Sequence, residues 1–226
     1  MLPTHIGFIM DGNGRWATKR GKPRNFGHKK GSEVLEKLCN YAFSKGVKVM
    51  SFYAFSTENW SRSNDEVSRL MALLRIMLKK YLPKFIKEEI RLVVSGDIYS
   101  VKVSEKGRKA ILDAVEKTKN FKERVCNICF NYGSRNEIVN AVNKLVERGE
   151  KVNEETFSKY LYTSDLPDVD LIIRTSGEQR LSNFLLWQSA YAELYFTDVL
   201  WPDYTEQELQ KALDWFDGRK RRFGGV

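Results

Sequence analysis

Three short segments of this sequence carry side chains that could do chemistry. The first is Asp11-Gly12-Asn13-Gly14-Arg15-Trp16. Asp11 could hold a divalent cation through its carboxylate, and Arg15 could donate charge-assisted hydrogen bonds to a phosphate. Glycines let a phosphate approach the backbone closely, and amides at the start of a following helix would attract it. The segment matches neither a Walker A loop nor a dinucleotide fingerprint, so a structural turn capped by Asp11 is an equally good interpretation.

The second segment is Ser56-Thr57-Glu58-Asn59-Trp60-Ser61-Arg62. It combines hydroxyls, an amide, an indole and a guanidinium, which together form a mixed polar and apolar surface. A ligand with both kinds of surface could bind there. A polar loop that caps the next helix is the alternative interpretation.

The third segment is Arg174-Thr175-Ser176-Gly177-Glu178-Gln179-Arg180-Leu181-Ser182-Asn183. Its two arginines and its hydroxyls suit bidentate capture of a phosphate. Glu193 follows in an apolar stretch, where a carboxylate requires a partner such as a cation or an arginine. A buried salt bridge is the alternative to a functional role for Glu193. Arg24 and His28 follow the first segment, and a lone histidine at a helix start is more often structural.

Elements that alternate along the chain must position these segments. Apolar runs predict strands at residues 5–10, 47–55, 90–95, 125–132, 169–175 and 194–196. Helical spacing and capping signals predict helices at residues 28–44, 63–82, 104–118, 136–148, 154–161 and from 205 onward. This alternation predicts an α/β fold with a mostly parallel sheet flanked by helices on both faces, in one domain over residues 1–226. Ligands of open parallel sheets bind beyond the carboxyl ends of the strands, where all three segments lie.

The predicted helix at residues 66–82 is apolar around more of its circumference than a surface helix needs. Deep burial is the more common meaning of such breadth, and the wall of a lipid tunnel is the alternative. Leu74, Met77 and Leu78 are candidates for such a wall because helical spacing places them near one another.

Charge and composition narrow the class of protein. The net charge of +9 implies an acidic partner, which could be nucleic acid, an anionic membrane surface or a phosphorylated substrate. No stretch approaches the ~18 uninterrupted apolar residues of a membrane helix, and the first residues lack a secretory signal, so we expect a cytoplasmic protein. Cys126 and Cys129 lie on opposite faces of a predicted strand, which argues against a zinc site and predicts buried structural thiols.

Longer blocks of the sequence resemble the cis-prenyltransferase family, in particular its bacterial undecaprenyl diphosphate synthases. The blocks are residues 5–16, 53–62, 131–135, 170–182, 183–202 and the ending 221–225. They cover nearly the whole chain in the family's order. The resemblance implies an α/β fold with an apolar tunnel. It also implies an enzyme that repeatedly condenses isopentenyl diphosphate onto an allylic diphosphate, expected to be farnesyl diphosphate, with cis double bonds. The implied product is undecaprenyl diphosphate, a cell-wall lipid carrier.

The resemblance also assigns roles to matching positions. Asp11 would act on Mg²⁺ and on the allylic diphosphate, with Glu193 as a second metal ligand. The other residues implied to grip the allylic diphosphate are Gly12, Asn13, Gly14, Arg15, Arg24 and His28. Those implied to bind isopentenyl diphosphate are Arg174, Arg180, Leu181, Ser182 and, from the partner subunit's chain end, Arg222 and Gly224. Trp16 and Trp60 would border the prenyl chains, and the pocket would be completed by Ser56, Thr57, Glu58 and Arg62.

Asn59 is the family's proton acceptor by the same resemblance. Because a neutral carboxamide is a very poor base, we expect Asn59 to orient the isopentenyl unit while a phosphate oxygen takes the proton. The aspartate-rich boxes of trans-prenyl synthases are absent from the sequence. The family implies a homodimer, no nucleic-acid partner, and peripheral contact with the inner face of the membrane for product release.

Two other classes of protein remain as alternatives. A nucleic-acid-binding module would account for the charge and for the basic run Arg219-Lys220-Arg221-Arg222, but not for Asp11 and Glu193. A steep salt dependence in filter binding would favour it. A non-catalytic subunit of a prenyltransferase is the second alternative, and turnover by the chain alone separates it from an enzyme.

Overall fold

The strands differ in how far they are buried. The computed structural model describes residues 1–221 of the chain. The strands are β1 (His5–Ile9), β2 (Val49–Ser56), β3 (Ile90–Ser95), β4 (Arg124–Tyr132), β5 (Leu171–Arg174) and β6 (Glu193–Phe196). The four strands β1, β2, β4 and β5 are buried along most of their length, whereas β6 has no fully buried residue. Every residue of β1 and β5 is buried, as expected for strands whose two faces are both covered.

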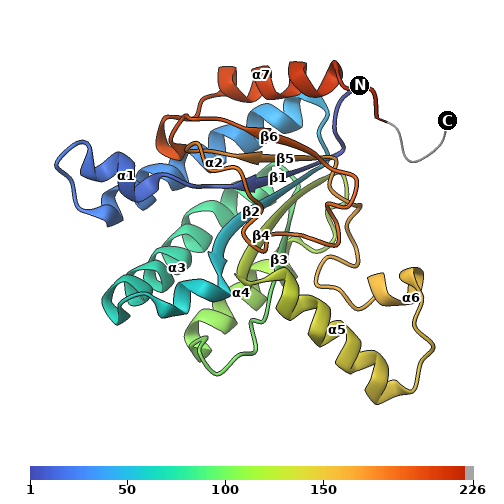
Figure 1. Cartoon of the computed structure of the whole chain (residues 1–226). Helices are drawn as coiled ribbons and strands as arrows, with labels where there is room; N and C mark the ends of the chain where they lie inside the picture. Colours follow the sequence, from blue (N-terminus) through green and yellow to red (C-terminus); the bar gives the residue numbers. More distant parts are fainter. Residues whose placement is uncertain (222–226) are drawn as a thin grey trace. The chain divides into compact units, whose positions relative to one another are not determined.

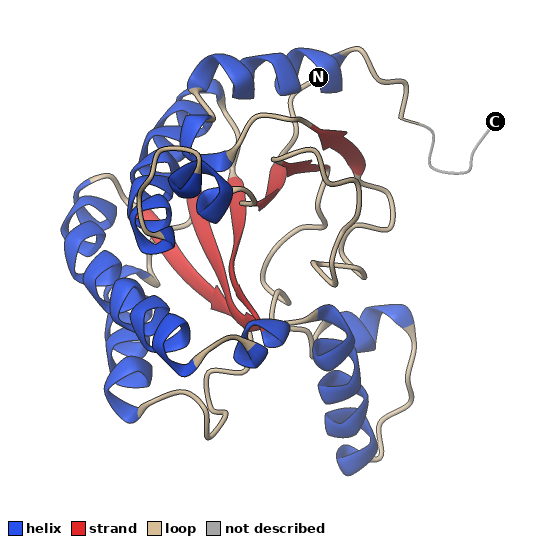
Figure 2. Cartoon of the chain, turned by 60° about the vertical axis from the view of Figure 1, so that its left-hand side comes forward, coloured by secondary structure: helices blue, strands red, loops and turns tan. Residues whose placement is uncertain are grey.

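The strands form one six-stranded sheet in the order β3-β4-β2-β1-β5-β6. The registered pairings of β1 with β2 and β5, of β5 with β6, and of β3 with β4 are all parallel. Helices flank the sheet (Figures 1 and 2). The α/β fold with a parallel sheet is therefore confirmed, because each parallel strand needs a crossover and this chain makes most of its crossovers with helices.

The helices follow the predicted ranges closely. They are α1 (Asn13–Thr18), α2 (Arg24–Lys45), α3 (Asn64–Lys87), α4 (Glu105–Thr118), α5 (Ser134–Arg148), α6 (Glu154–Ser158) and α7 (Glu206–Asp217), with 3₁₀ turns η1 (Thr57–Ser61) and η2 (Trp201–Asp203). The predicted caps Ser63 and Thr205 accept hydrogen bonds from the backbone of Glu66 and Glu208. Helix α1 was not predicted, because Gly12 and Gly14 indicated a loop.

The chain divides into two compact units that share β2. One comprises residues 1–52, 168–180 and 188 onward, and the other residues 53–167 and 181–187. Among the described residues, no helix combines the length and the apolar composition that crossing a membrane requires. Cys126 and Cys129 are buried in β4 as free thiols, as predicted. The single catalytic domain over residues 1–226 stays a prediction.

In the first unit, two glycines hold α1 against α2. A Cβ atom on Gly27 would lie 1.9 Å from the carbonyl oxygen of Asn13, and one on Gly31 would lie 2.2 Å from the side-chain oxygen of Asn13. Only glycine permits so close an approach of the two helices. Behind them, the Phe8 ring stacks on Phe52 with centroids 5.4 Å apart. The segment that follows β1 is therefore held rigidly against α2.

In the second unit, α3 is less buried than the breadth of its apolar surface suggested. Tyr81 is its only fully buried residue, and its other apolar residues are partly exposed. The prediction of deep burial was therefore wrong, because α3 packs against α4 and β3 on one side only. The residues of α3 that contact the buried cluster of Phe55, Val103, Ile111 and Phe130 are Val67, Leu70, Met71, Leu74 and Leu78.

Asn183 ties three segments of the second unit together. Its amide nitrogen donates to Glu58 Oε1 of η1 at 2.9 Å, and its side-chain oxygen accepts from the backbone of Arg135 at 2.9 Å. Its own carbonyl accepts from the backbone of Ser134. A Cβ on Gly133 would lie 2.5 Å from the Thr57 hydroxyl oxygen, so the junction leaves no room for a side chain there. Asn183 thus positions η1 relative to the start of α5.

We expect Asn183→Gly to lower the free energy of unfolding by about 1–3 kcal/mol, since two partners lose their hydrogen bonds. Asn183→Ala should lose roughly 1 kcal/mol more, because φ is 66° at this residue and alanine is strained there. Exposed Asn120→Ala is the matched control, and urea denaturation measures all three. Stability of Asn183→Gly equal to that of the wild type would contradict this role.

The same variant has a pH signature. Burial raises the pKa of Glu58, but hydrogen bonds led by the one from Asn183 hold it below its ordinary 4.5. A carboxyl group whose pKa is lower in the folded than in the unfolded state stabilises the fold at pH values above its unfolded-state pKa. This stabilisation is lost as the pH falls through the folded-state pKa. The stability difference between the wild type and Asn183→Gly should therefore shrink below pH 4.5.

Candidate functional site

Asp11 lies between two arginines just beyond the carboxyl end of β1. One carboxylate oxygen accepts a hydrogen bond from Arg174 Nη2 at 3.2 Å, and the other lies 3.4 Å from Arg15 Nη2. The backbone N–H of Gly12 donates to the second oxygen at 2.6 Å. Thr175 holds the backbone of Asp11, because its hydroxyl donates to the Asp11 carbonyl and accepts from the Asp11 N–H. The carboxylate is therefore fixed among donors.

These neighbours keep Asp11 ionised. Burial raises the pKa of its carboxyl, but the hydrogen bonds from Arg174 and Gly12 and the charges of Arg15 and Arg174 outweigh burial. The pKa consequently lies below its ordinary 3.8. Asp11 carries a full negative charge at neutral pH, which a divalent cation requires of a carboxylate ligand.

The end of β5 supplies the second wall of this site. Arg174 is its last residue, with only 5% of its side chain exposed, and Nη1 donates to the carbonyl of Arg180. Arg15 donates to the carbonyl and hydroxyl oxygens of Ser176, whose φ is 77°. Arg180 is exposed and pairs with Glu178. The structure therefore brings Asp11, Arg15 and Arg174 together, while Arg180 lies exposed and paired with Glu178.

Helices α1 and α2 supply the cationic rim. The guanidinium of Arg24 lies over Gly14, where a Cβ would be 2.9 Å from it. His28 is partly buried one turn further along α2. Trp16 is buried and its indole donates to Asp203 at 2.6 Å, while its ring stacks on Phe26. Gly12 has a φ of 102°, which requires glycine.

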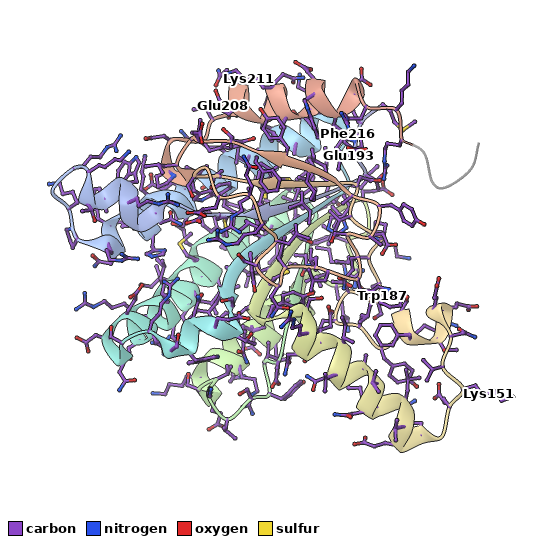
Figure 3. All side chains as sticks on the ribbon, in the orientation of Figure 1. Lys151, Trp187, Glu193, Glu208, Lys211 and Phe216 are labelled. Carbon is purple, nitrogen blue, oxygen red and sulfur yellow. The ribbon has the colours of Figure 1, made fainter. Side chains whose placement is uncertain are left out.

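The structure does not bring Glu193 to Asp11 within one chain. Glu193 begins β6 and pairs with Leu171 at the start of β5, whereas Asp11 and Arg174 lie at the opposite strand ends. Its carboxylate pairs with Arg219 at 3.1 Å, so the expected partner is an arginine. Figure 3 labels Glu193 on the ribbon. Arg221 pairs with Asp170 at 2.6 Å at the same end of the sheet. Arg222 and Gly224 lie outside the described residues.

The second unit carries a further group of predicted residues on η1 and at its two caps, Ser56 and Arg62. Asn59 Oδ1 accepts the backbone N–H of Ser56 at 3.1 Å, so its carbonyl is used to cap η1. The Trp60 indole donates to Asn131 at 2.7 Å, and its ring meets Phe55 edge-on. Arg62 pairs with Glu66. The amide nitrogen of Asn59 takes no part in this cap, which fits an orienting role.

Leu181 and Ser182 lie on the short segment that belongs to the second unit. Leu181 is partly buried, while Ser182 is exposed with a φ of 49°. The carbonyl of Ser182 accepts a hydrogen bond from the Tyr53 hydroxyl at 3.3 Å. The same segment carries Asn183, so η1 and Ser182 are held by one network.

Three supporting residues were given no individual role from the sequence, although Thr175 and Ser176 lie within the third segment. Thr175 and Ser176 orient Asp11 and Arg15, and Asn131 holds Trp60. Hydroxyls directly after a buried strand were a usable signal for the first two. Asn131 gave no such signal, because its φ of 48° and its bond to the carbonyl of Asp97 arise only in the folded chain.

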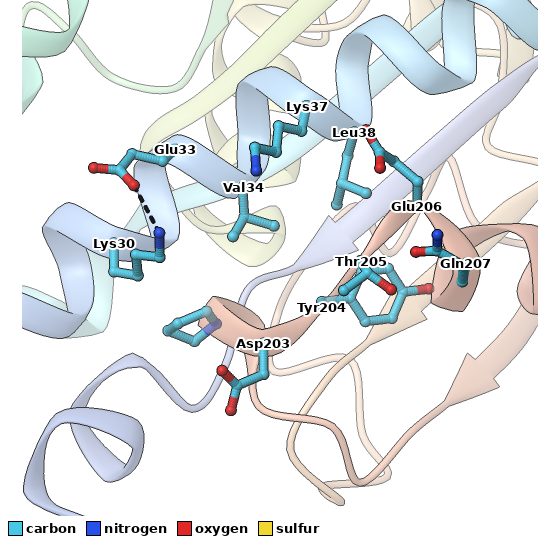
Figure 4. A pocket seen from close by; sticks show the side chains of 11 residues that line it. Lys30, Glu33, Val34, Lys37, Leu38, Asp203, Tyr204, Thr205, Glu206 and Gln207 are labelled. Carbon is cyan, nitrogen blue, oxygen red and sulfur yellow. Dashed lines mark hydrogen bonds and ion pairs between the residues drawn. The ribbon is translucent and has the colours of Figure 1, made fainter. Parts of the chain in front are cut away.

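A cavity of about 280 Å³ lies elsewhere in the first unit, between α2 and the segment that leads into α7. Lys30 and Glu33 form an ion pair at its lining (Figure 4). None of the predicted site residues lines it. The cavity is therefore separate from the cluster around Asp11.

Known proteins resemble this chain over its whole length. Residues 9–224 match the prenyltransferase family model described as undecaprenyl diphosphate synthase. An isoprenyl transferase of Fusobacterium nucleatum is 55% identical over 226 residues, covering 100% of this chain and 97% of its own length. An isoprenyl transferase of Streptococcus thermophilus is 48% identical over 236 residues, covering 100% of this chain and 94% of its own length.

Two solved structures share the fold. Lavandulyl diphosphate synthase from Lavandula x intermedia, in complex with dimethylallyl diphosphate, has a TM-score of 0.94 at 34% identity and covers 99% of each chain. A probable undecaprenyl diphosphate synthase from Campylobacter jejuni has a TM-score of 0.84 at 35% identity, covering 100% of this chain and 99% of its own. Neither alternative class of protein is favoured by these matches. The chain belongs to the undecaprenyl diphosphate synthase family of cis-prenyltransferases.

Proposed function

We propose that this enzyme condenses isopentenyl diphosphate repeatedly onto farnesyl diphosphate, with cis double bonds, to make undecaprenyl diphosphate. The observation that carries the proposal is the ionised Asp11 carboxylate held between Arg15 and Arg174 at the carboxyl ends of β1 and β5. Family membership supports the reaction class and the diphosphate substrates. The identity of the primer and the length of the product are the finer parts of the proposal.

Cationic donors would stabilise the negative charge of the departing diphosphate. Arg15, Arg24 and His28, with the segment Gly12 to Gly14, would hold the allylic diphosphate. As the bond between the allylic carbon and the diphosphate oxygen breaks, its electron pair leaves with the diphosphate, whose growing charge these donors stabilise. Pre-positioned donors are effective because they need no reorganisation during the reaction.

The other arginine group would hold the attacking substrate. Arg174 and Arg180, with Ser182 and the Leu181 backbone beside it, would bind isopentenyl diphosphate. Its double bond supplies the electron pair of the new carbon–carbon bond, and loss of a proton from the adjacent carbon forms the new cis double bond. Asn59 would orient this unit, and a phosphate oxygen would take the proton.

The residues present fit the Mg²⁺ ion that the family implies. Mg²⁺ is usually held by one or two carboxylates together with substrate phosphates, and Asp11 is an ionised, partly exposed carboxylate. Residues 1–221 contain no group of three or more His, Cys, Asp or Glu side chains suited to a metal, so substrate and water would supply most ligands. When bound, the ion would neutralise charge on the diphosphate. Because the register separates Glu193 from Asp11, Glu193 could serve only the partner subunit's site.

Activity is expected to require Asp11 and Mg²⁺. Asp11→Ala should reduce turnover by at least ~100-fold, a typical loss for one electrostatic stabiliser, and chelation of Mg²⁺ should abolish turnover. The control is Asp165→Ala, which removes an exposed ion pair with Arg91. Incorporation of labelled isopentenyl diphosphate measures both variants. Near-normal turnover by folded Asp11→Ala protein would refute the assignment of this site.

Product length is expected to depend on the inner face of α3. Its partly buried apolar residues are what a tunnel wall open to a prenyl chain would present, and Leu74 and Leu78 contact the buried cluster. Leu74→Trp should shorten the product because it would fill space that the chain needs. Exposed Ser68→Trp on the same helix is the control. Product sizing by thin-layer chromatography tests this, and chiefly short products from the wild type would contradict undecaprenyl length.

The active enzyme is proposed to be a homodimer in which Arg222 and Gly224 complete the partner's site. Arg219 and Arg221 pair with Glu193 and Asp170 at the strand starts, far along the sheet from Asp11. A chain end that is anchored there reaches the site of its own subunit less easily than it reaches the site of a neighbouring subunit. Removal of residues 222–226 should raise the KM for isopentenyl diphosphate and lower turnover without unfolding the protein.

A mixing experiment tests this sharing. The truncated chain and full-length Arg174→Ala should each be weak as homodimers. Their heterodimer contains one site with an intact Arg174 and an intact incoming chain end, so the mixture should regain activity. If proven subunit exchange brings no recovery, the chain end does not act across the interface.

A further inference from the structure

Asn131 is a buried polar residue that no step of the proposed reaction uses. It is the last residue but one of β4, and 4% of its surface is exposed. Its φ is 48°, in the left-handed region that residues other than glycine seldom adopt. Such a conformation persists only where surrounding contacts hold it, and it is common at functional sites. The contacts of Asn131 therefore indicate what this conformation serves.

Both ends of the Asn131 side-chain amide make hydrogen bonds. The oxygen accepts the indole N–H of Trp60 at 2.7 Å, and the nitrogen donates to the carbonyl of Asp97 at 2.6 Å. The N–H of Asp97 donates in return to the Asn131 carbonyl at 3.1 Å. A side-chain amide suits this place because one of its terminal atoms accepts and the other donates. Asn131 thus joins η1, β4 and the loop of residues 96–104.

The Trp60 ring is held from other sides as well. The Phe55 ring meets it edge-on, with the two centroids 4.9 Å apart. Lys102, on the same loop as Asp97, places its ammonium 5.8 Å from the centroid of the Trp60 ring, within the range of a cation–π contact. These ring contacts tolerate rotation of the indole in its own plane, whereas a hydrogen bond from its N–H does not. Packing therefore fixes where the ring lies, and Asn131 fixes its orientation.

The 3₁₀ turn η1 depends on anchors of this kind. It has five residues, too few to be stable through its own hydrogen bonds. Asn183 anchors it at Glu58, and Asn131 anchors it at Trp60. Asn59 lies between these two anchored residues. The orientation of Asn59 therefore depends on both anchors.

We propose that Asn131 is a positioning residue, which acts through Trp60 to hold η1 in the orientation that isopentenyl diphosphate requires. This inference rests on the proposed function, in which Asn59 orients the isopentenyl unit. The allylic diphosphate is assigned to donors of the first unit. Loss of the Asn131 amide should therefore change the KM for isopentenyl diphosphate and leave the KM for farnesyl diphosphate alone.

A double-mutant cycle in steady-state kinetics tests the proposal. Asn131→Gly removes the amide while glycine still adopts a φ of 48°, and Trp60→Phe removes the indole N–H while keeping an aromatic ring. Asn131→Gly should raise the KM for isopentenyl diphosphate about 3- to 10-fold, the effect of one lost hydrogen bond. The double variant should have the KM of Trp60→Phe, because without the indole N–H the amide has nothing to orient.

Stability measured by urea denaturation separates positioning from general support. Asn131→Gly should lower the free energy of unfolding in both backgrounds, because the hydrogen bond to Asp97 is lost in each. A merely structural residue would also raise the KM in both backgrounds, so additive effects on the KM would overturn the proposal. The matched control is Ser158→Ala, which removes the acceptor of another indole of this unit, that of Trp187. It should leave both KM values unchanged.

A measurement without turnover keeps this inference apart from the proposed function. The chain has five tryptophans, so ¹⁵N labelling of tryptophan gives five indole signals, and the signal lost in Trp60→Phe is that of Trp60. Its N–H should exchange with solvent at least about fivefold faster in Asn131→Gly and at the wild-type rate in Ser158→Ala. Unchanged exchange in Asn131→Gly would overturn the positioning role. An inactive wild type that shows the faster exchange in Asn131→Gly would refute the proposed function alone.

Asn131→Asp serves as the conservative variant, and it replaces Asn131→Gly if that protein does not fold. Aspartate tolerates the left-handed φ and keeps an oxygen for the Trp60 indole, but it cannot donate to Asp97. It should therefore be less stable than the wild type while its KM for isopentenyl diphosphate stays within about twofold, since the indole keeps its acceptor. A larger rise in KM while the Trp60 N–H exchanges at the wild-type rate would contradict the proposal, because the KM would then not follow the indole.

Discussion

The carboxylate of Asp11 is the constraint on which the functional part of this structure depends. A carboxylate that must stay ionised while half-buried needs fixed donors, and Arg174, Arg15 and the Gly12 amide supply them. Those donors come from two segments that lie far apart in the chain, one with Gly12 and Arg15 and the other with Arg174. The sheet must therefore place β5 beside β1, so that Arg174 and Thr175 end opposite Asp11. The parallel register of β1 and β5 thus sets the geometry of the site around Asp11.

Close backbone approach is the second requirement. Gly27 and Gly31 let α2 contact the first turn of α1, which holds Arg24 over Gly14. In the second unit, Gly133 lets Thr57 of η1 approach its backbone closely, and Asn183 donates a hydrogen bond to Glu58 of η1. Both contacts position η1, which carries Asn59 and Trp60. Each unit therefore builds its share of the functional residues on rigid elements. Solved relatives with different product names share the fold of this chain at TM-scores of 0.94 and 0.84, so the fold alone does not identify the product.

Helix α3 combines two environments on one element. Its inner side is apolar and partly buried, and its outer side is cationic with exposed isoleucines. A helix that served only to fill a core would be buried on the first side and mixed in charge on the second. The proposed function assigns the apolar inner side to the growing prenyl chain.

The sequence alone determined the order of the strands and of the longer helices, the α/β class, the capping residues Ser63 and Thr205, and the three segments that hold most of the functional residues. These features depend on local periodicity and on residue type, which are visible without a fold. Tertiary structure decided the rest. The pairing of Asp11 with Arg174 spans 163 positions and depends on strand register. The separation of Glu193 from Asp11, and the partial exposure of α3, likewise follow from which strand ends meet and which faces are covered. No local pattern encodes those relations, because they are set by packing between distant segments.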